Sequence, residues 1–340
     1  MHLGGLAVSV FPVFAFLALL ILMDSFKLVP LRAVLRSIAV GLLVALVALR
    51  LNTWIMDGFA LDPVAYRRYG APLVEELLKC LWVVFLLRSH RVGFMIDAAI
   101  HGFALGSGFA LVENVFYYLQ LHADASPFLW IVRGFGTAVV HGSTMAVFAT
   151  LSKSLADRHG STGPRIFLPG FLLAVAAHSL FNHFLLHPLA MTAILLVVLP
   201  LLVIGVFEQS ERATRHWLGS GFDSDAEILD SIVTGDVRQT RVGAYLQSLR
   251  SRFSTTVVAD ILCYLQIYLE LSMRAKTQLM AREAGVQLPV GEDVRANLEE
   301  LRYLEKSIGK TGKLALLPLL RRSSRDSWQL TLLRHESWRP

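Results

Sequence analysis

The stretch Pro72-Leu73-Val74-Glu75-Glu76-Leu77-Leu78-Lys79 opens an apolar run that continues to Leu87. Two adjacent carboxylates and a lysine therefore stand at the head of a segment that otherwise has the character of a membrane span. Ionisable side chains inside a bilayer are costly and rare, and by default they mark a functional site with a partner nearby. Lys79 follows Glu75 by one helical turn and Glu76 by slightly less, so it can pair with either carboxylate. The other glutamate is then free for chemistry.

Composition places this stretch in a membrane protein. Of 340 residues, 54% are hydrophobic and 17% are charged, and the mean hydropathy is positive at +0.54. Charged residues are sparse up to residue 207 and dense afterwards, which predicts a transmembrane domain over 1–207 and a polar tail domain over 208–340. The net charge of +6 is no sign of nucleic-acid binding, because basic residues in membrane-protein loops mainly set topology. Cys80 and Cys263 lie in different domains, so no disulfide framework is expected.

The predicted fold is all-α: a polytopic membrane helix bundle of about seven transmembrane helices, followed by a cytosolic helical domain. A span needs about 20 largely apolar residues. The candidates are residues 3–23, 33–51, 72–88, 95–120, 128–151, 166–186 and 189–207. In the tail, apolar residues recur at helical spacing over 240–284, as in a small helical bundle or docking module.

Basic residues gather at alternate loops of this bundle, which predicts its orientation. Because cytoplasmic loops are enriched in Lys and Arg, the first, third and fifth loops are expected in the cytoplasm, with the N-terminus outside and the C-terminus inside. The residues counted for these loops are Lys27, Arg32, Arg36, Arg88, Arg91, Lys153, Arg158 and Arg165, against Arg50, Arg67 and Arg68 on the other side.

Three further spans carry polar groups that suit the glutamate pair. Glu113 shares its helical side with small residues, as does His141, and His178 lies one turn before Asn182 on the same face. From a rise of about 1.5 Å per residue, all of these groups fall in the outer half of the membrane. We therefore expect them to converge in one pocket.

Such a pocket can activate water in two ways. Neutral imidazoles and a carboxylate are good zinc ligands, so Glu113, His141 and His178 form one candidate metal set, with Glu75 or Glu76 polarising the bound water. In the metal-free alternative a glutamate activates water directly, while a histidine and Asn182 donate to the developing oxyanion. The sequence leaves open whether Zn²⁺ is bound and which glutamate is the base.

These motifs carry a resemblance to a known family. P-x-x-E-E-x-x-K at 72–79, G-F-A-x-x-E-N at 108–114, His141, and His178-x-x-x-Asn182 are similar to motifs of the PrsW family of intramembrane proteases, which is related to the CAAX-prenyl-protease (Abi) superfamily. The resemblance covers about residues 70–185. It implies a polytopic peptidase of a bacterial cell membrane that clips a membrane-anchored protein from the extracytoplasmic side, in regulated proteolysis. Glu75, Glu76, Glu113, His141 and His178 match the family's glutamates and histidines.

Two other functions remain open at the level of sequence. A proton- or cation-coupled transporter could use the same carboxylates and histidines as a relay, although no internal repeat is evident. A non-enzymatic scaffold could act through its tail. The long tail departs from shorter family members, which leaves room for regulation or a cytosolic partner.

Overall fold

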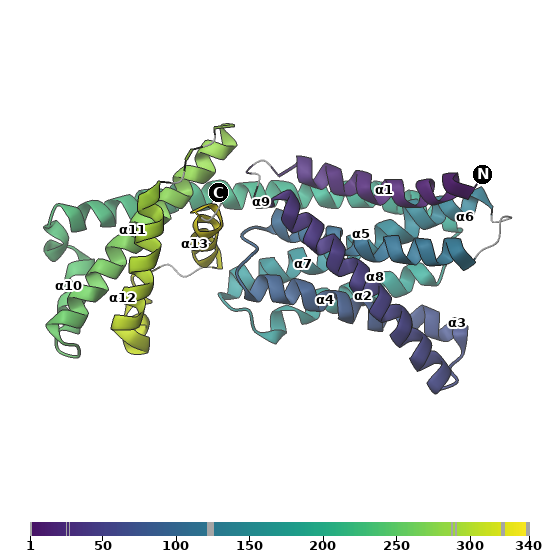
Figure 1. The fold of residues 1–340 in the computed structure, drawn as a ribbon, viewed down its shortest axis with the longest axis horizontal. Helices are drawn as coiled ribbons and strands as arrows, with labels where there is room; N and C mark the ends of the chain where they lie inside the picture. The colour runs from purple at the N-terminus through teal and green to yellow at the C-terminus, as the bar shows by residue number, and fades with distance from the viewer. Residues whose placement is uncertain are drawn as a thin grey trace. The chain divides into compact units, whose positions relative to one another are not determined.

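The computed structural model describes residues 2–24, 26, 28–120, 126–286, 288–289, 291–320 and 324–337 (Figure 1). Within these ranges the chain is helical and contains no β-strand, so the all-α fold class is confirmed. The chain divides into two compact units, Met1–Ser210 and Glu211–Pro340. Lys27, which was counted for the topology, lies outside the described residues.

Unit 1 contains the segment with which the sequence analysis began. Its elements are α1 (His2–Leu22), α2 (Leu31–Gly58), α3 (Pro63–Ala65), the π-helix η1 (Tyr66–Gly70), α4 (Ala71–Arg88), α5 (Met95–Gln120), α6 (Pro127–Ile131), the π-helix η2 (Val132–Ala138), α7 (Val139–His159), the 3-10 helix η3 (Pro164–Ile166), α8 (Leu168–Asn182) and the first part of α9 (Pro188–Val233). The two π-helices are single irregular turns, which occur frequently at functional sites. One leads into the helix of Glu75 and Glu76, and the other leads into the helix of His141.

Helix α5 forms the centre of unit 1 and packs against α1, α2, α4 and α7 (Figure 1). Most of its residues are buried, because glycine and alanine let neighbouring backbones approach closely. A Cβ atom on Gly106 would lie 2.1 Å from the carbonyl oxygen of His141 on α7, and one on Gly108 would lie 2.1 Å from that of Ile38 on α2. Glycine at these two positions is therefore a condition for the observed packing.

Six helices among the described residues are long and apolar enough to cross a membrane. They are Leu31–Gly58, Met95–Gln120, Pro127–His159, Pro164–Asn182, Pro188–Val233 and Thr255–Glu283. The predicted count of seven is not confirmed. Helix α1 contributes a shorter apolar segment, Ala7–Leu22, and α4 is not among the six because it carries Glu75, Glu76, Lys79 and Arg88. Helix α11 in unit 2 was predicted within the cytosolic domain, yet it also qualifies by length and composition.

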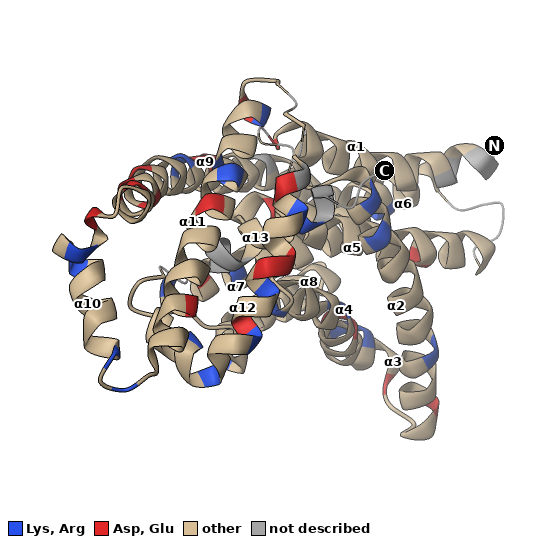
Figure 2. Ribbon diagram, turned by 60° about the vertical axis from the view of Figure 1, so that its left-hand side comes forward, with Lys and Arg blue, Asp and Glu red and all other residues tan. Residues whose placement is uncertain are grey.

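The outer surface of unit 1 is apolar. On α2, the side chains of Leu35, Leu43, Leu46 and Val47 are all more than half exposed. A monomeric soluble domain rarely leaves such a continuous apolar face uncovered, whereas lipid tails match it. Figure 2 shows few charged residues on the helices of unit 1 and many on α10 to α12.

Unit 2 has a core of its own. It comprises the remainder of α9, the 3-10 helix η4 (Asp236–Gln239), α10 (Arg241–Leu249), α11 (Thr255–Glu283), α12 (Glu292–Leu316) and α13 (Ser324–Ser337). Helix α11 packs against α12 and α13, with Ile261 and Leu265 fully buried. The predicted boundary after residue 207 falls inside α9, a continuous helix of 46 residues, and three residues before the division between the units.

Candidate active site

Glu76 is fully buried inside unit 1 and contacts three neighbouring polar side chains. It has no exposed surface, and its Oε1 lies 2.5 Å from Lys79 Nζ and 2.7 Å from His178 Nδ1. Its Oε2 accepts a hydrogen bond of 3.2 Å from the Thr144 hydroxyl. Of the two carboxylates that sequence spacing offered to Lys79, the structure therefore pairs the lysine with Glu76.

His141 on α7 is held at both ring nitrogens. Its Nδ1 lies 3.1 Å from Lys79 Nζ, and its Nε2 lies 2.6 Å from Glu113 Oε2. Because an ammonium group can only donate, Nδ1 accepts, and the ring proton on Nε2 is donated to Glu113. The Lys79 ammonium also lies 4.5 Å from the centre of the Phe109 ring, so it is enclosed on several sides.

His178 on α8 contacts the same cluster through Glu76. Since the Glu76 carboxylate is an acceptor, His178 donates its Nδ1 proton to it, and in the neutral imidazole Nε2 then carries the lone pair. This Nε2 lies 4.0 Å from Glu75 Oε2. The rings of His141 and His178 meet edge to face, with 4.8 Å between their centres.

Glu75 differs from the other two site glutamates in its partners. Its side chain is 16% exposed, and in the part of the chain that the structure describes no Lys or Arg lies within ion-pair distance of it. Its Oε1 instead accepts a hydrogen bond of 3.0 Å from Asn52 Nδ2, and Asn52 Oδ1 accepts one of 2.8 Å from the Tyr66 hydroxyl. The sequence analysis missed Asn52 and Tyr66. A lone amide near the end of an apolar helix was the available signal for Asn52.

Glu113 is held by a second network. Its Oε1 lies 3.4 Å from Arg133 Nη2, and Arg133 Nε donates to Asn114 Oδ1 at 3.0 Å. Asn114 in turn donates to the backbone carbonyl of Ser9 on α1 at 2.8 Å. Arg133 comes from the π-helix η2, and its guanidinium lies 3.8 Å from the centre of the Tyr117 ring. Glu113 is thus paired with a buried cation while 27% of its side chain stays exposed.

The structure does not bring Asn182 into this cluster. Its Nδ2 donates to the backbone carbonyl of Arg67 at 3.0 Å, and Ser179 donates to that of Arg68 at 2.6 Å. Both carbonyls belong to the π-helix η1, which leads directly into α4. Helix α8 therefore anchors the turn from which Glu75 and Glu76 follow.

Three of the side chains can hold a metal ion. Glu75, His141 and His178 each offer one ligand atom, and these atoms all lie within 4.8 Å of one another. Two imidazoles and one carboxylate suit Zn²⁺ and leave a fourth position for water. His178 Nε2 is available as it stands, while His141 must give up one of its two partners. The set predicted from sequence had Glu113 in place of Glu75, and Glu113 lies at hydrogen-bond distance from His141 instead.

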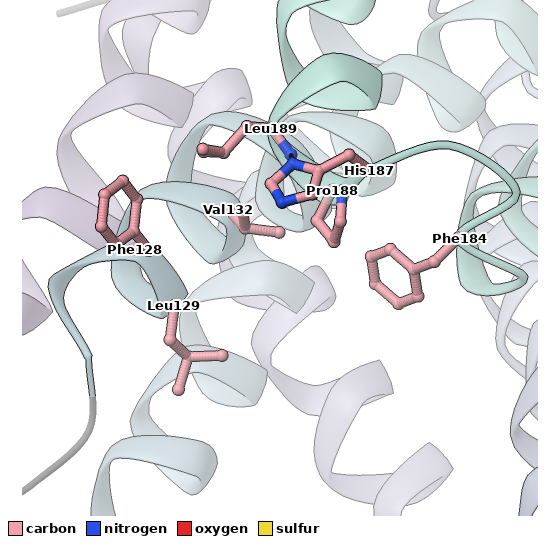
Figure 3. Close-up of a pocket in the computed structure, with 7 residues that line it drawn as sticks. All are labelled: Phe128, Leu129, Val132, Phe184, His187, Pro188 and Leu189. Carbon is pink, nitrogen blue, oxygen red and sulfur yellow. Dashed lines mark hydrogen bonds between the residues drawn. The ribbon is translucent and has the colours of Figure 1, made fainter.

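An apolar pocket lies elsewhere in unit 1. Its volume is about 540 Å³. Figure 3 shows its lining residues, which come from α6 and η2 on one side and from the α8–α9 connection on the other. Its lining residues are Phe128, Leu129, Val132, Phe184, His187, Pro188 and Leu189. None of the clustered glutamates and histidines lines it, although Val132 immediately precedes Arg133.

A helical bundle with an apolar surface and a buried cluster of glutamates and histidines is typical of a membrane-embedded protein with a candidate metal centre. The model of the PrsW family of intramembrane metalloproteases matches residues 29–206, so the chain belongs to this family. It is an integral membrane protein and a protease, which acts on a membrane protein substrate. No curated protein and no solved structure matches the chain. The family match supports the protease hypothesis and gives no support to the transporter hypothesis.

Proposed function

We propose that this protein is an intramembrane endopeptidase that hydrolyses a peptide bond of a membrane-anchored protein with water activated among Glu75, His141 and His178. The observation that carries this proposal is the difference between the three glutamates. Lys79 neutralises Glu76 and Arg133 neutralises Glu113. Among the described residues no Lys or Arg lies within ion-pair distance of Glu75, which accepts a hydrogen bond from the neutral amide of Asn52 and lies 4.0 Å from His178 Nε2. A largely buried carboxylate without a lysine or arginine beside it is the one best suited to bind a cation or accept a proton.

In this proposal Zn²⁺ is held by Glu75, His141 and His178. A bound zinc ion supplies a Lewis acid that makes water a competent nucleophile near neutral pH. His178 Nε2 would be one ligand atom, and His141 Nδ1 would be another once it gives up its hydrogen bond from Lys79, since Glu76 and Glu113 hold the remaining ring nitrogens.

Glu76 and Glu113 orient the two histidines. Carboxylates that accept the second ring proton of a ligating histidine fix its tautomer and raise its basicity. Glu76 does this for His178 and Glu113 does it for His141, with Lys79 and Arg133 holding the carboxylates in turn. In the metal-free alternative, Glu75 itself accepts the proton of the attacking water.

Glu75 and Glu113 are the partly exposed carboxylates of the site, so the substrate's peptide bond is expected to enter from their side. We place the N-terminus outside a bacterial cell membrane and unit 2 in the cytoplasm, following the distribution of basic residues. Cleavage then takes place near the extracytoplasmic face, and unit 2 is left free for a cytosolic partner. Reporter enzymes fused to residues 1 and 340 test this orientation.

Comparative proteomics of membranes tests the proposed function. Cells with the wild-type protein are compared with cells carrying Glu75→Gln, and with cells carrying Asp57→Asn as a matched carboxylate-to-amide control at the exposed end of α2. We expect one membrane-anchored protein to accumulate uncleaved in the Glu75→Gln cells only. Unchanged membrane proteomes, with Glu75→Gln expressed and inserted normally, would refute the proposal.

A further inference from the structure

Two polar side chains from outside the glutamate and histidine motifs extend the site beyond Glu75. Asn52 lies near the end of α2 and Tyr66 in the π-helix η1, and their side chains join in a chain that ends on Glu75. The Tyr66 hydroxyl donates to Asn52 Oδ1 at 2.8 Å, and Asn52 Nδ2 donates to Glu75 Oε1 at 3.0 Å. Tyr66 is buried and Asn52 is partly buried, so water competes weakly for these bonds.

The direction of the hydrogen bonds follows from chemistry. A carboxylate only accepts, so the amide nitrogen of Asn52 must face Glu75. The amide oxygen then faces Tyr66, where only a donor is compatible, and the phenolic hydroxyl supplies it. The Glu75 carboxylate therefore fixes the orientation of the Asn52 amide, and the hydrogen bond from Tyr66 holds the other end of that amide in place.

This arrangement determines which oxygen of Glu75 faces the histidines. With Oε1 held by Asn52, Oε2 is the oxygen that lies 4.0 Å from His178 Nε2. The partner is a neutral amide, so it brings no positive charge of its own to the carboxylate. A lysine or arginine in the same place would orient Glu75 equally well, but it would oppose the binding of a cation.

We propose that Asn52 and Tyr66 are positioning residues that hold Glu75 with one oxygen presented to the metal centre. This rests on the proposed function, because it assumes that Glu75 is the reactive carboxylate. Asn52 acts directly on Glu75, and Tyr66 acts through Asn52. Loss of an outer-shell partner of this kind lowers metal affinity or activity by roughly 10–100-fold.

The test measures Zn²⁺ affinity and cleavage with the purified full-length protein. Zn²⁺ affinity is determined by competition with a chromophoric chelator, and cleavage is followed on the protein that accumulates in Glu75→Gln membranes. The variants are Asn52→Leu, Tyr66→Phe and the double variant. Thr53→Val, at the exposed neighbour of Asn52, and Tyr69→Phe, at the exposed tyrosine of η1, are the matched controls.

We expect Asn52→Leu to weaken Zn²⁺ binding and to lower kcat by about 10–100-fold, with KM unchanged. Tyr66→Phe should act in the same direction by a smaller factor. Because Tyr66 acts through Asn52, the double variant should be no worse than Asn52→Leu alone. The controls should match the wild type. Should Asn52→Leu fail to fold, Tyr66→Phe decides, since it removes one hydroxyl group only.

Wild-type kcat and Zn²⁺ affinity in both single variants, alongside an inactive Glu75→Gln, would overturn the positioning role and leave the proposed function standing. Cleavage by Glu75→Gln at the wild-type rate would instead overturn the proposed function. If the wild-type protein binds no Zn²⁺, the change in kcat decides by itself. A fully additive double variant would show that Tyr66 does not act through Asn52.

Discussion

Replacing Gly106 by alanine should separate the two helices that carry Glu113 and His141. The added Cβ would lie 2.1 Å from the carbonyl oxygen of His141 and 2.4 Å from its carbonyl carbon, whereas ordinary contact begins at 3.4 Å. Both atoms are backbone, so no side chain can rotate away. Helices α5 and α7 must therefore move apart by about 1 Å, since dense interiors hold no free space to absorb the methyl group. The hydrogen bond of 2.6 Å between Glu113 and His141 spans this gap.

A misplacement of about 1 Å at a catalytic group can lower the rate by about 10²-fold, and overpacking costs about 1–3 kcal/mol of stability. We expect Gly106→Ala to lower kcat on the accumulating substrate. We also expect it to lower the midpoint of thermal unfolding in detergent. Gly205→Ala is the matched control, because a Cβ at that helical position meets nothing within 4 Å. A wild-type rate in Gly106→Ala would show that the α5–α7 contact does not set the geometry of the site.

Three further substitutions separate the roles of neighbouring side chains. Lys79→Met leaves the fully buried Glu76 without its cation, so we expect a loss of about 3–5 kcal/mol in unfolding free energy by denaturant titration; a stability equal to wild type would contradict the pairing. Arg133→Gln removes the cation beside Glu113, and kcat should fall about 10–100-fold while the protein retains Zn²⁺. Loss of Zn²⁺ would instead show that the Arg133–Glu113 pair is needed to bind the metal. Asn182→Leu removes a hydrogen bond to the backbone of η1, worth about 1 kcal/mol. An effect of about 10²–10³ in kcat without loss of stability would favour the role in oxyanion stabilisation that the sequence suggested for Asn182.

Local spacing was enough to predict part of the site. The distance of about one helical turn between the paired glutamates and Lys79 predicted an ion pair, and the small residues beside Glu113 predicted a close helix contact. Spacing could not tell which glutamate binds the lysine, because both positions reach it. The choice depends on Thr144 and His178, which come from helices distant in the sequence and enclose Glu76.

Other features depend on contacts that leave no local pattern. Asn52 contacts Glu75, and Tyr66 contacts Asn52, only because α2 and η1 fold back on α4. A lone amide in an apolar helix signals a polar contact but does not say with which side chain. Hydropathy falls after residue 207, and a domain boundary was predicted there, yet α9 continues as a helix to Val233. Helical hydrogen bonding does not require an apolar sequence, so the end of a hydrophobic run does not mark the end of a helix.

The zinc content of three purified proteins tests the central claim most directly. Wild type, Glu75→Gln and Glu113→Gln are compared by elemental analysis after extraction in detergent, with X-ray absorption at the zinc edge to identify the ligands. We predict one Zn²⁺ bound by two imidazoles and a carboxylate in the wild type, lost in Glu75→Gln and retained in Glu113→Gln. Retention in Glu75→Gln with loss in Glu113→Gln would contradict the assignment and favour the ligand set of Glu113, His141 and His178.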